Sequence, residues 1–513
     1  MWRNRFHEIE TLSGFIEILH NSIKTITMKK LTVTILVILL LISCKTEKKG
    51  HQKSTETKSG QITPISDTVL ESAVIYEANI RQYSPEGTFG AFTKDIPKLK
   101  ALGVKIIWVM PIFPISETRR KAKGDLFVSD IKDKSERKKY LGSYYAVSDF
   151  RKINPEFGTL EDFRQLLKTA HDNEMYVILD WVPNHTGWDH HWIKEHPEFY
   201  TKNAKGEITD PLNNDGTSRG WTDVADLNYN NPQLHKAMIA DMLYWITQEN
   251  IDGFRCDVAG SVPVSFWQEA ISQLRATKDI FMLAEAWEPE LMHDHLFDMV
   301  YAWEGHHIMN DIAKGHKTAN DWDAYMTKID TLYEKDDILM NFITNHDENS
   351  WNGTVGERMG DAAETMLALS YVTPGMPLIY SGQEYGLNRR LKFFEKDSIP
   401  KTKGKMWALL EKLGQLKNVN PALNGGKKAA SYTRISTGND ESILAFQRKK
   451  GEASVFFVAN LTATPAEFSL PLTGNFKDFI KNSDVELTKN QKFRFKPWEY
   501  AIYIQRTRLN FLD

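Results

Sequence analysis

Cysteine, long hydrophobic runs and an excess of one charge are all scarce in this sequence. Only Cys44 and Cys256 occur among 513 residues, which excludes a disulfide framework and a cysteine-rich metal site. The 64 basic and 67 acidic side chains leave a net charge of -3, so the chain has no general attraction to nucleic acid. Stability must come from packing, for which 41% hydrophobic residues supply ample material.

The N-terminal region carries an export signal. Two lysines in residues 28–30 precede an uncharged stretch at residues 31–43, which is shorter than the about 20 residues of a membrane-spanning helix. The stretch ends Leu41-Ile42-Ser43-Cys44, which resembles the lipobox of bacterial lipoproteins, where the cysteine is lipidated after cleavage. We therefore expect residues 1–44 to be an N-terminal extension and lipoprotein signal, with the protein anchored to a membrane of the bacterial cell envelope through Cys44. An uncleaved hydrophobic helix is the alternative.

Residues 45–71 follow as a predicted flexible tether, because Lys, Thr, Ser, Glu and Gly dominate there. From residue 72, short β-branched runs alternate with segments of helical period. The eight strand candidates are residues 73–80, 104–110, 176–180, 251–257, 280–285, 297–302, 339–344 and 376–380. Thr159 is placed to cap one of the helices between them. The pattern predicts a (β/α)8 barrel over residues 72–424.

Two features extend beyond this barrel. Residues 187–224 form an irregular insertion after the third strand, which we interpret as a small subdomain. Alternating apolar runs after residue 424, separated by turn residues, predict a C-terminal antiparallel β-sandwich over residues 425–513.

Acidic side chains stand at the C-terminal ends of several predicted strands, which meet at one mouth in a barrel of this type. Asp180 follows the third strand, Asp257 the fourth, Glu285 the fifth and Asp347 the seventh. Carboxylates around one mouth suggest glycoside hydrolysis, in which one acts as nucleophile and another as general acid. Arg255 lies two residues before Asp257 in an extended strand and can hold that carboxylate ionised.

The expected roles follow from these surroundings. Asp257 suits the nucleophile, whereas desolvation after an apolar run should raise the pKa of Glu285 and keep it protonated as the acid. Cys256 alternates away from the mouth and should pack as a small hydrophobe. Taken singly, each of these residues has an ordinary structural explanation, such as an ion pair between Arg255 and Asp257. Their joint occurrence favours a catalytic site.

The same segments resemble the motifs of the α-amylase family of retaining glycoside hydrolases. The resemblance implies that Asp257 is the nucleophile, Glu285 the general acid/base and Asp347 the acid that binds and distorts the sugar. It also implies supporting contacts to substrate from a set of polar and aromatic residues, namely Tyr145, Asp180, His185, Arg255 and His346. In family members with a structural calcium, the positions matching Asn184 and Asp226 bind it, so we expect either a calcium or a metal-free hydrogen-bonded Asn184 here.

Departures from the family pattern leave the preferred linkage and chain length open. Ser143 stands where many α-amylases have His, and Gly260-Ser261 stands where they have Lys-His. Val258 occurs in relatives that act on α-1,6 bonds or on cyclomaltodextrins. We expect hydrolysis of mainly α-1,4 bonds in starch, maltodextrins or related α-glucans, with no organic cofactor. The alternatives are a cyclomaltodextrinase or neopullulanase-like enzyme, an α-glucosidase, a glucanotransferase, or a non-catalytic sugar-binding barrel.

Overall fold

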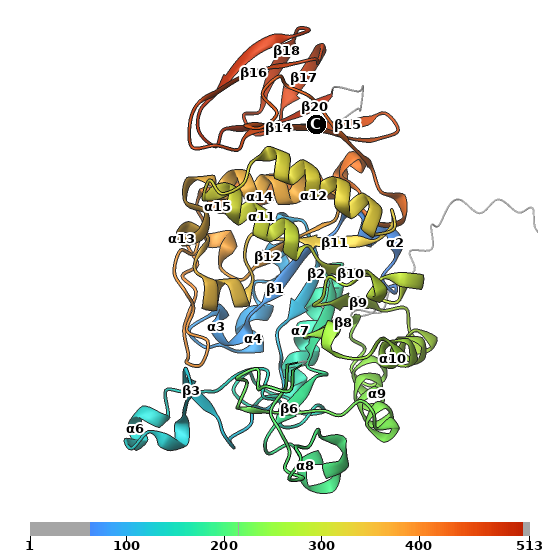
Figure 1. Cartoon of the computed structure of the whole chain (residues 1–513), viewed down its shortest axis with the longest axis vertical. Helices are drawn as coiled ribbons and strands as arrows, with labels where there is room; N and C mark the ends of the chain where they lie inside the picture. Colours follow the sequence, from blue (N-terminus) through green and yellow to red (C-terminus); the bar gives the residue numbers. More distant parts are fainter. Residues whose placement is uncertain (1–61, 214, 506–513) are drawn as a thin grey trace, which may run out of the picture. The chain divides into compact units, whose positions relative to one another are not determined.

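The computed structural model describes residues 62–213 and 215–505 and contains a closed barrel of eight parallel strands (Figure 1). All eight predicted strands are confirmed as strands of this barrel. In chain order they are β1 (Val74–Ala78), β2 (Val104–Val109), β5 (Tyr176–Trp181), β8 (Gly253–Cys256), β9 (Phe281–Ala284), β10 (Met299–Tyr301), β11 (Ile338–Asn341) and β12 (Met376–Tyr380). β1 pairs with both β2 and β12, which closes the barrel.

Side-chain alternation explains why these strands read as continuous hydrophobic runs. One parity, such as Ile75 and Leu283, packs inside the barrel, and the other, such as Tyr76 and Phe254, packs outward against helices. Gly253 allows an especially close approach between β8 and β9, because a Cβ there would lie 1.9 Å from the Phe281 carbonyl oxygen. Both surfaces of the barrel wall are therefore buried.

Helices surround the strands, and the N-cap predicted at Thr159 is confirmed. Thr159 caps α7, accepting a hydrogen bond from the Asp162 amide in a capping box. The longer helices are α7 (Leu160–Asp172), α9 (Pro232–Thr247), α10 (Val264–Thr277), α11 (Trp303–Ala313), α12 (Ala319–Leu332), α14 (Ala363–Val372) and α15 (Lys405–Val419). Shorter ones are α3 (Ile80–Tyr83), α4 (Phe89–Thr93), α5 (Ile96–Leu99) and α13 (Val355–Met359).

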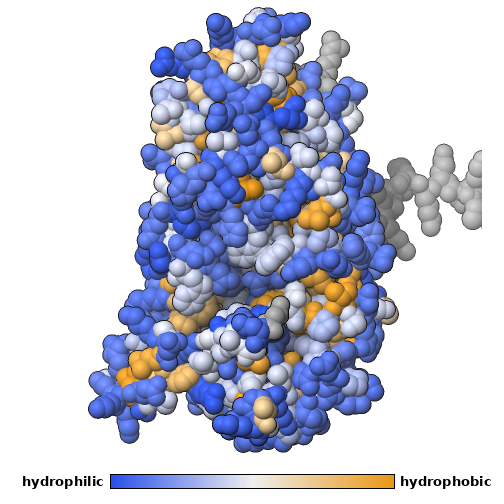
Figure 2. Space-filling view, viewed as in Figure 1, coloured by the Kyte–Doolittle hydropathy of each residue, from blue (hydrophilic) through white to orange (hydrophobic). Residues whose placement is uncertain are grey.

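Two long segments project from the barrel on the side of the C-terminal strand ends. One carries β3 (Lys121–Lys123), β4 (Leu126–Phe127) and α6 (Lys134–Arg137), and its Leu126 is exposed. Figure 2 shows apolar residues on this arm. The other is the predicted insertion, bounded by the antiparallel pair β6 (His185–Gly187) and β7 (Val224–Asp226), with α8 (Trp192–Glu195) between them.

The C-terminal region is an antiparallel β domain. A six-stranded sheet in the order β13-β14-β15-β20-β17-β18 is joined by the two-stranded sheet β16-β19. The bounds are β13 (Ser431–Arg434), β14 (Ile443–Lys450), β15 (Ala453–Asn460), β16 (Ala466–Leu470), β17 (Gly474–Asp478), β18 (Ser483–Leu487), β19 (Gln491–Phe495) and β20 (Tyr500–Gln505). Ile443 and Ala445 of β14 share a core with β16 and β19, whereas Leu444 and Phe446 join the barrel's core. Alternate side chains of β14 therefore pack in two different cores.

Part of the segment predicted to be a flexible tether packs against the barrel. The tether was expected to run to residue 71, but α2 (Asp67–Ser72) is helical and Ile65 is buried against the barrel core. Apolar side chains at Ile65, Val69 and Leu70 explain this, because they give the segment a surface to bury. The signal, Cys44 and most of the tether lie outside the described residues. Within the part that is described, no helix combines the length and apolar character needed to cross a bilayer.

Candidate active site

The guanidinium of Arg255 joins three carboxylates at the C-terminal ends of three strands. Its Nη1 lies 2.8 Å from Asp180 Oδ1 and 2.9 Å from Asp257 Oδ1, and its Nη2 lies 2.8 Å from Glu285 Oε2. Nε completes the set by donating to the Tyr301 hydroxyl at 3.1 Å. Arg255 and Asp180 are fully buried, so this cluster lies in a medium where charge interactions are strong.

Strand register and parity produce this convergence. Asp180 of β5 and Arg255 of β8 are direct neighbours in register, and Arg255 is paired with Leu283 of β9. Since inward-facing positions recur every second residue, Asp257 follows Arg255 and Glu285 follows Leu283 on the inner side. Cys256 faces outward and is fully buried, as expected of a small hydrophobe.

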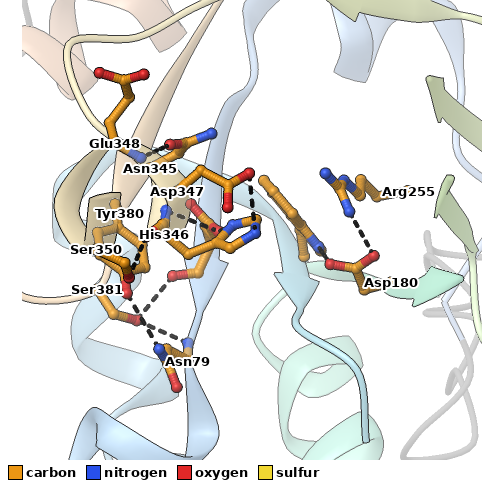
Figure 3. Close-up of polar contacts among 12 residues, drawn as sticks. Asn79, Asp180, Arg255, Asn345, His346, Asp347, Glu348, Ser350, Tyr380 and Ser381 are labelled. Carbon is orange, nitrogen blue, oxygen red and sulfur yellow. Dashed lines mark hydrogen bonds and ion pairs between the residues drawn. The ribbon is translucent and has the colours of Figure 1, made fainter. Parts of the chain in front are cut away.

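An ion pair and two hydrogen bonds connect Asp347 to this cluster. Figure 3 shows the contact of Asp347 with His346 and that of Arg255 with Asp180. His346 Nε2 lies 3.5 Å from Asp347 Oδ2 and 2.8 Å from the Tyr145 hydroxyl, which donates to Asp180 Oδ2 at 3.1 Å. The Tyr145 and His346 rings are also stacked, with centroids 5.5 Å apart. All three predicted acids, Asp257, Glu285 and Asp347, therefore belong to one connected site, together with the predicted supporting residues Tyr145, Asp180, Arg255 and His346.

His346 is cationic at neutral pH. Burial lowers its pKa, but the charges of Asp347 and Glu77 and a hydrogen bond to Glu77 outweigh burial and raise the pKa to about 9. Its Nδ1 donates to Glu77 Oε1, so both ring nitrogens face acceptors, as an imidazolium requires. The positive charge of His346 partly offsets the carboxylates around it.

The protonation of the Asp257 and Glu285 pair differs from the sequence-based expectation. Burial raises the pKa of Glu285, but Arg255 and the Val258 amide outweigh burial, and the pKa of Glu285 is lowered. Burial and the charge of Glu285 raise the pKa of Asp257 well above its usual range. One cause is that Glu285 Oε2 accepts a hydrogen bond from the Val258 amide and forms an ion pair with Arg255 Nη2, whereas Asp257 shares Arg255 Nη1 with Asp180. The surroundings thus favour the charged form of Glu285 more than that of Asp257.

Val258 has a strained backbone that serves Glu285. Its φ of 45° and ψ of 42° lie in the left-handed region, which a β-branched residue rarely adopts. This conformation directs the Val258 amide to Glu285 Oε2 at 2.8 Å. Strain of this kind costs about 1–3 kcal/mol and is typical of active sites.

Comparison with known proteins agrees with this geometry. The sequence profile described as "Alpha amylase, catalytic domain" matches residues 54–415, and "Maltogenic Amylase, C-terminal domain" matches residues 432–502. The chain belongs to the α-amylase family. It is 24% identical over 490 residues to alpha-amylase 3 of Dictyoglomus thermophilum, covering 82% of this chain and 90% of that protein. It is 23% identical over 424 residues to alpha-amylase MalA of Haloarcula japonica, covering 80% of this chain but 58% of that longer relative.

Among solved structures, the chain is similar to a maltogenic α-amylase, AmyB, from Thermotoga neapolitana. The TM-score is 0.73 at 27% identity, and the match covers 85% of this chain and 98% of that one. The likeness therefore extends over the barrel and the C-terminal domain of an α-amylase family enzyme.

The remaining predicted residues lie where the inserted subdomain meets the barrel. His185 is buried, and burial together with Arg219 lowers its pKa to about 3, so this side chain is neutral. Asn184 and Asp226 are brought together, because β6 and β7 pair His185 with Asp226 and the Leu227 amide donates to the Asn184 carbonyl. The Asn184 side chain lies 3.2 Å from His185 Nδ1.

The positions that depart from the family pattern have their own contacts. Ser143 Oγ accepts a hydrogen bond from the Tyr145 amide at 3.2 Å, which helps to position that tyrosine. Ser261 Oγ accepts one from Arg219 Nη1 at 3.1 Å. A cation from the inserted subdomain thus reaches the turn after the β8 strand, where many relatives carry a basic residue in the turn itself.

Three polar contacts of the site were missed at the sequence level. Glu77 is fully buried and binds His346, Trp108 Nε1 donates to Asp180 Oδ2 at 3.0 Å, and Tyr301 binds Arg255. The signal for Glu77 was present, since it is the one charged residue among the buried positions of β1. Trp108 and Tyr301 gave no such signal, because aromatic residues in strands are equally suited to a plain core.

Proposed function

We propose that this protein hydrolyses α-glucosidic bonds, mainly α-1,4, in starch, maltodextrins or related α-glucans, with retention of anomeric configuration. The observation that carries the proposal is the single guanidinium of Arg255 between Asp257 and Glu285. One guanidinium can bridge two carboxylates only when they are close, and retaining glycosidases need the shorter carboxyl separation of about 5 Å.

The proposed reaction has two displacements. A carboxylate oxygen of Asp257 attacks the anomeric carbon while the glycosidic C–O bond breaks, and Glu285 gives its proton to the leaving oxygen. Water then attacks the glycosyl ester, Glu285 takes a proton from that water, and Asp257 leaves as a carboxylate. This order requires Glu285 to be protonated and Asp257 to be ionised when substrate is bound. The leaving oxygen favours the protonated form of Glu285, because it offers an acceptor for that proton.

The other polar groups hold the sugar and stabilise the transition state. Asp347 is the most exposed of the three acids, with 36% of its side chain accessible, and is therefore available to accept hydrogen bonds from sugar hydroxyls. Tyr145 and neutral His185 complete the proposed binding surface, with the ring of Tyr145 as the stacking surface. Arg255 keeps the carboxylates charged as positive charge develops on the sugar.

A product profile on amylose, pullulan, cyclodextrin and maltotriose tests this function. The proposal predicts reducing ends from amylose and maltotriose, and α-anomers as first products by NMR. A β-anomer as the first product would contradict retention. Disproportionation of maltotriose into longer chains would instead favour a glucanotransferase, and the absence of cleavage of all four would favour a sugar-binding protein.

We also propose that the protein is lipid-anchored in a bacterial cell envelope through Cys44. The support is the sequence of the export signal and its Leu41-Ile42-Ser43-Cys44 ending. An extracellular or periplasmic position suits an enzyme whose polymeric substrates are too large to cross a membrane.

A structural calcium between Asn184 and Asp226 is a further proposal, and the donor chemistry fits it. Amide and carboxylate oxygens are what this cation prefers. Burial raises the pKa of Asp226 to about 6 despite Thr201 and Arg219, so a nearby cation would favour its charged form. A calcium there would link β7 to the end of β5. In the described part of the chain no group of three or more His, Cys, Asp or Glu could hold a metal, so the remaining ligands would be carbonyl oxygens or water.

Thermal unfolding with calcium and with a chelator tests this site. Calcium should raise the melting temperature of the wild type but not of Asp226→Ala. Equal melting temperatures of the wild type in both conditions would remove the proposal.

A further inference from the structure

Trp351 is an exposed tryptophan held directly against a proposed catalytic acid. Its Nε1 donates a hydrogen bond to Asp347 Oδ1 at 3.2 Å. The opposite oxygen, Oδ2, faces His346 Nε2 at 3.5 Å. The two carboxylate oxygens of Asp347 therefore have different partners, one a cationic ring and one a neutral indole.

Trp351 is one of two strongly exposed tryptophans among the described residues; the other, Trp287, is 59% exposed. The side chain of Trp351 is 51% exposed, whereas Trp108, Trp181, Trp245, Trp267 and Trp322 are all completely buried. Its ring rests against Phe393 and Phe394, with centroids 5.0 and 6.0 Å away, so one part of the indole is supported while another remains open to solvent. An apolar surface left open beside polar side chains is a feature of ligand-binding sites.

The backbone around Trp351 has an uncommon local structure. Residues Glu348–Asn352 form a π-helix, a rare structure that is frequent at functional sites. Two buried residues fix it: Glu348 is bound by His306 and Arg358, and the Asn349 side chain bonds to the backbone of Arg389 and Leu391. The anchoring of these neighbours holds Trp351 at the surface next to Asp347.

We infer that Trp351 has two roles, which rest on the proposed glycosidase function: it positions Asp347 through its N–H group, and its open indole surface binds a glucose ring beside Asp347. An indole suits both tasks, because it offers a flat apolar surface to the C–H groups of a sugar and a donor at its edge. The ligand is thus a glucose unit of an α-glucan that occupies the cleft alongside the reacting sugar.

Two variants separate the roles. Trp351→Phe keeps an aromatic surface but removes the donor, and Trp351→Gln keeps a donor but removes the surface. For Trp351→Phe we expect kcat to fall about tenfold with little change in KM, as for loss of a hydrogen bond to a charged group. For Trp351→Gln we expect KM for maltoheptaose to rise about tenfold with a smaller change in kcat. Leu332→Ala, at an exposed residue on α12, is the matched control and should change neither constant.

Binding without turnover keeps this inference separate from the proposed function. Calorimetric titration of maltoheptaose into Asp257→Asn should show about tenfold weaker binding when Trp351→Gln is added. If the wild type cleaves glucans but both Trp351 variants match the control, the inference is wrong and the function stands. If the wild type cleaves nothing, the function fails, and the titration alone decides whether Trp351 binds sugar. Equal falls in kcat for both variants, in proportion to lower melting temperatures, would show a merely structural role.

Discussion

Arg255 Nη2 lies 2.8 Å from Glu285 Oε2, and the guanidinium that makes this contact is completely buried. The arrangement links the charges of the barrel interior to Glu285, the proposed acid/base group. Removal of Arg255 would leave uncompensated negative charge in a medium of low polarity.

Arg255→Met should therefore destabilise the protein and inactivate it. Asp180, Asp257 and Glu285 would lose their common cation, and breaking a buried ion pair costs about 3–5 kcal/mol. Urea unfolding measures the loss. Lys427→Met breaks the exposed pair with Asp67 and should leave the unfolding curve unchanged. If Arg255→Met unfolds at the wild-type urea concentration, the cluster is not charged as described.

Asp257→Asn should abolish the release of reducing sugar while leaving the fold intact. The amide cannot form the glycosyl ester, so we expect at least about a thousandfold loss, equivalent to about 4 kcal/mol of transition-state stabilisation. Circular dichroism and reducing-sugar assays measure the two properties. Substantial turnover by a correctly folded variant would remove the nucleophile assignment.

The kcat/KM of the wild type should fall as pH rises through about 9, where His346 loses its proton. Because the pKa of His346 is raised above its ordinary 6.5, its contribution to stability is also complete below pH 6.5 and is lost through pH 9. His346→Gln should lower activity and abolish this alkaline limb. The control His196→Gln alters an exposed histidine and should retain the limb. An unchanged limb in His346→Gln would show that another group titrates.

Stability should also depend on Glu384, a buried carboxyl far in sequence from its partner. Tyr76 donates to Glu384 Oε1 at 2.7 Å and the Gly382 amide to Oε2 at 2.8 Å, but burial outweighs both and raises the pKa to about 7. A carboxyl with a raised pKa in the folded state contributes stability below pH 4.5 that is lost as pH rises through 7, here about 3 kcal/mol. Urea unfolding of the wild type relative to Glu384→Gln between pH 4.5 and 8 measures it. A constant difference between the two proteins would contradict the prediction.

Cys44→Ala should release the protein from membrane fractions of its host. The lipid is attached to this thiol in the proposed anchor, so without it the chain has no acyl group to insert. Immunoblotting of membrane and soluble fractions measures the distribution, with Cys256→Ala as the control that should stay membrane-bound. Retention of Cys44→Ala in the membrane would exclude the anchor.

Much of the fold and of the site could be predicted from local patterns. Eight apolar runs of the right length, each followed by a helical period, indicate the barrel because strands buried on both sides must be hydrophobic throughout. The acids Asp180, Asp257 and Glu285 could be assigned to one mouth because parallel strands end on the same side. The N-cap at Thr159 could also be predicted, because it depends only on residues close to it in the sequence. By contrast, the burial of Ile65 could not be predicted locally, because it depends on core residues that are distant in the sequence.

The sequence by itself determined which strand each acid follows, that the acids face the same side as Arg255, and that the chain belongs to the α-amylase family. Each of these depends on spacing along the chain. Only the tertiary structure decided which groups share charge. Glu77 meets His346 from 269 residues away, and the surrounding groups raise the pKa of Asp257 and lower that of Glu285. Protonation follows the field of all neighbouring charges and the loss of water around them, and these neighbours are assembled only when the barrel closes.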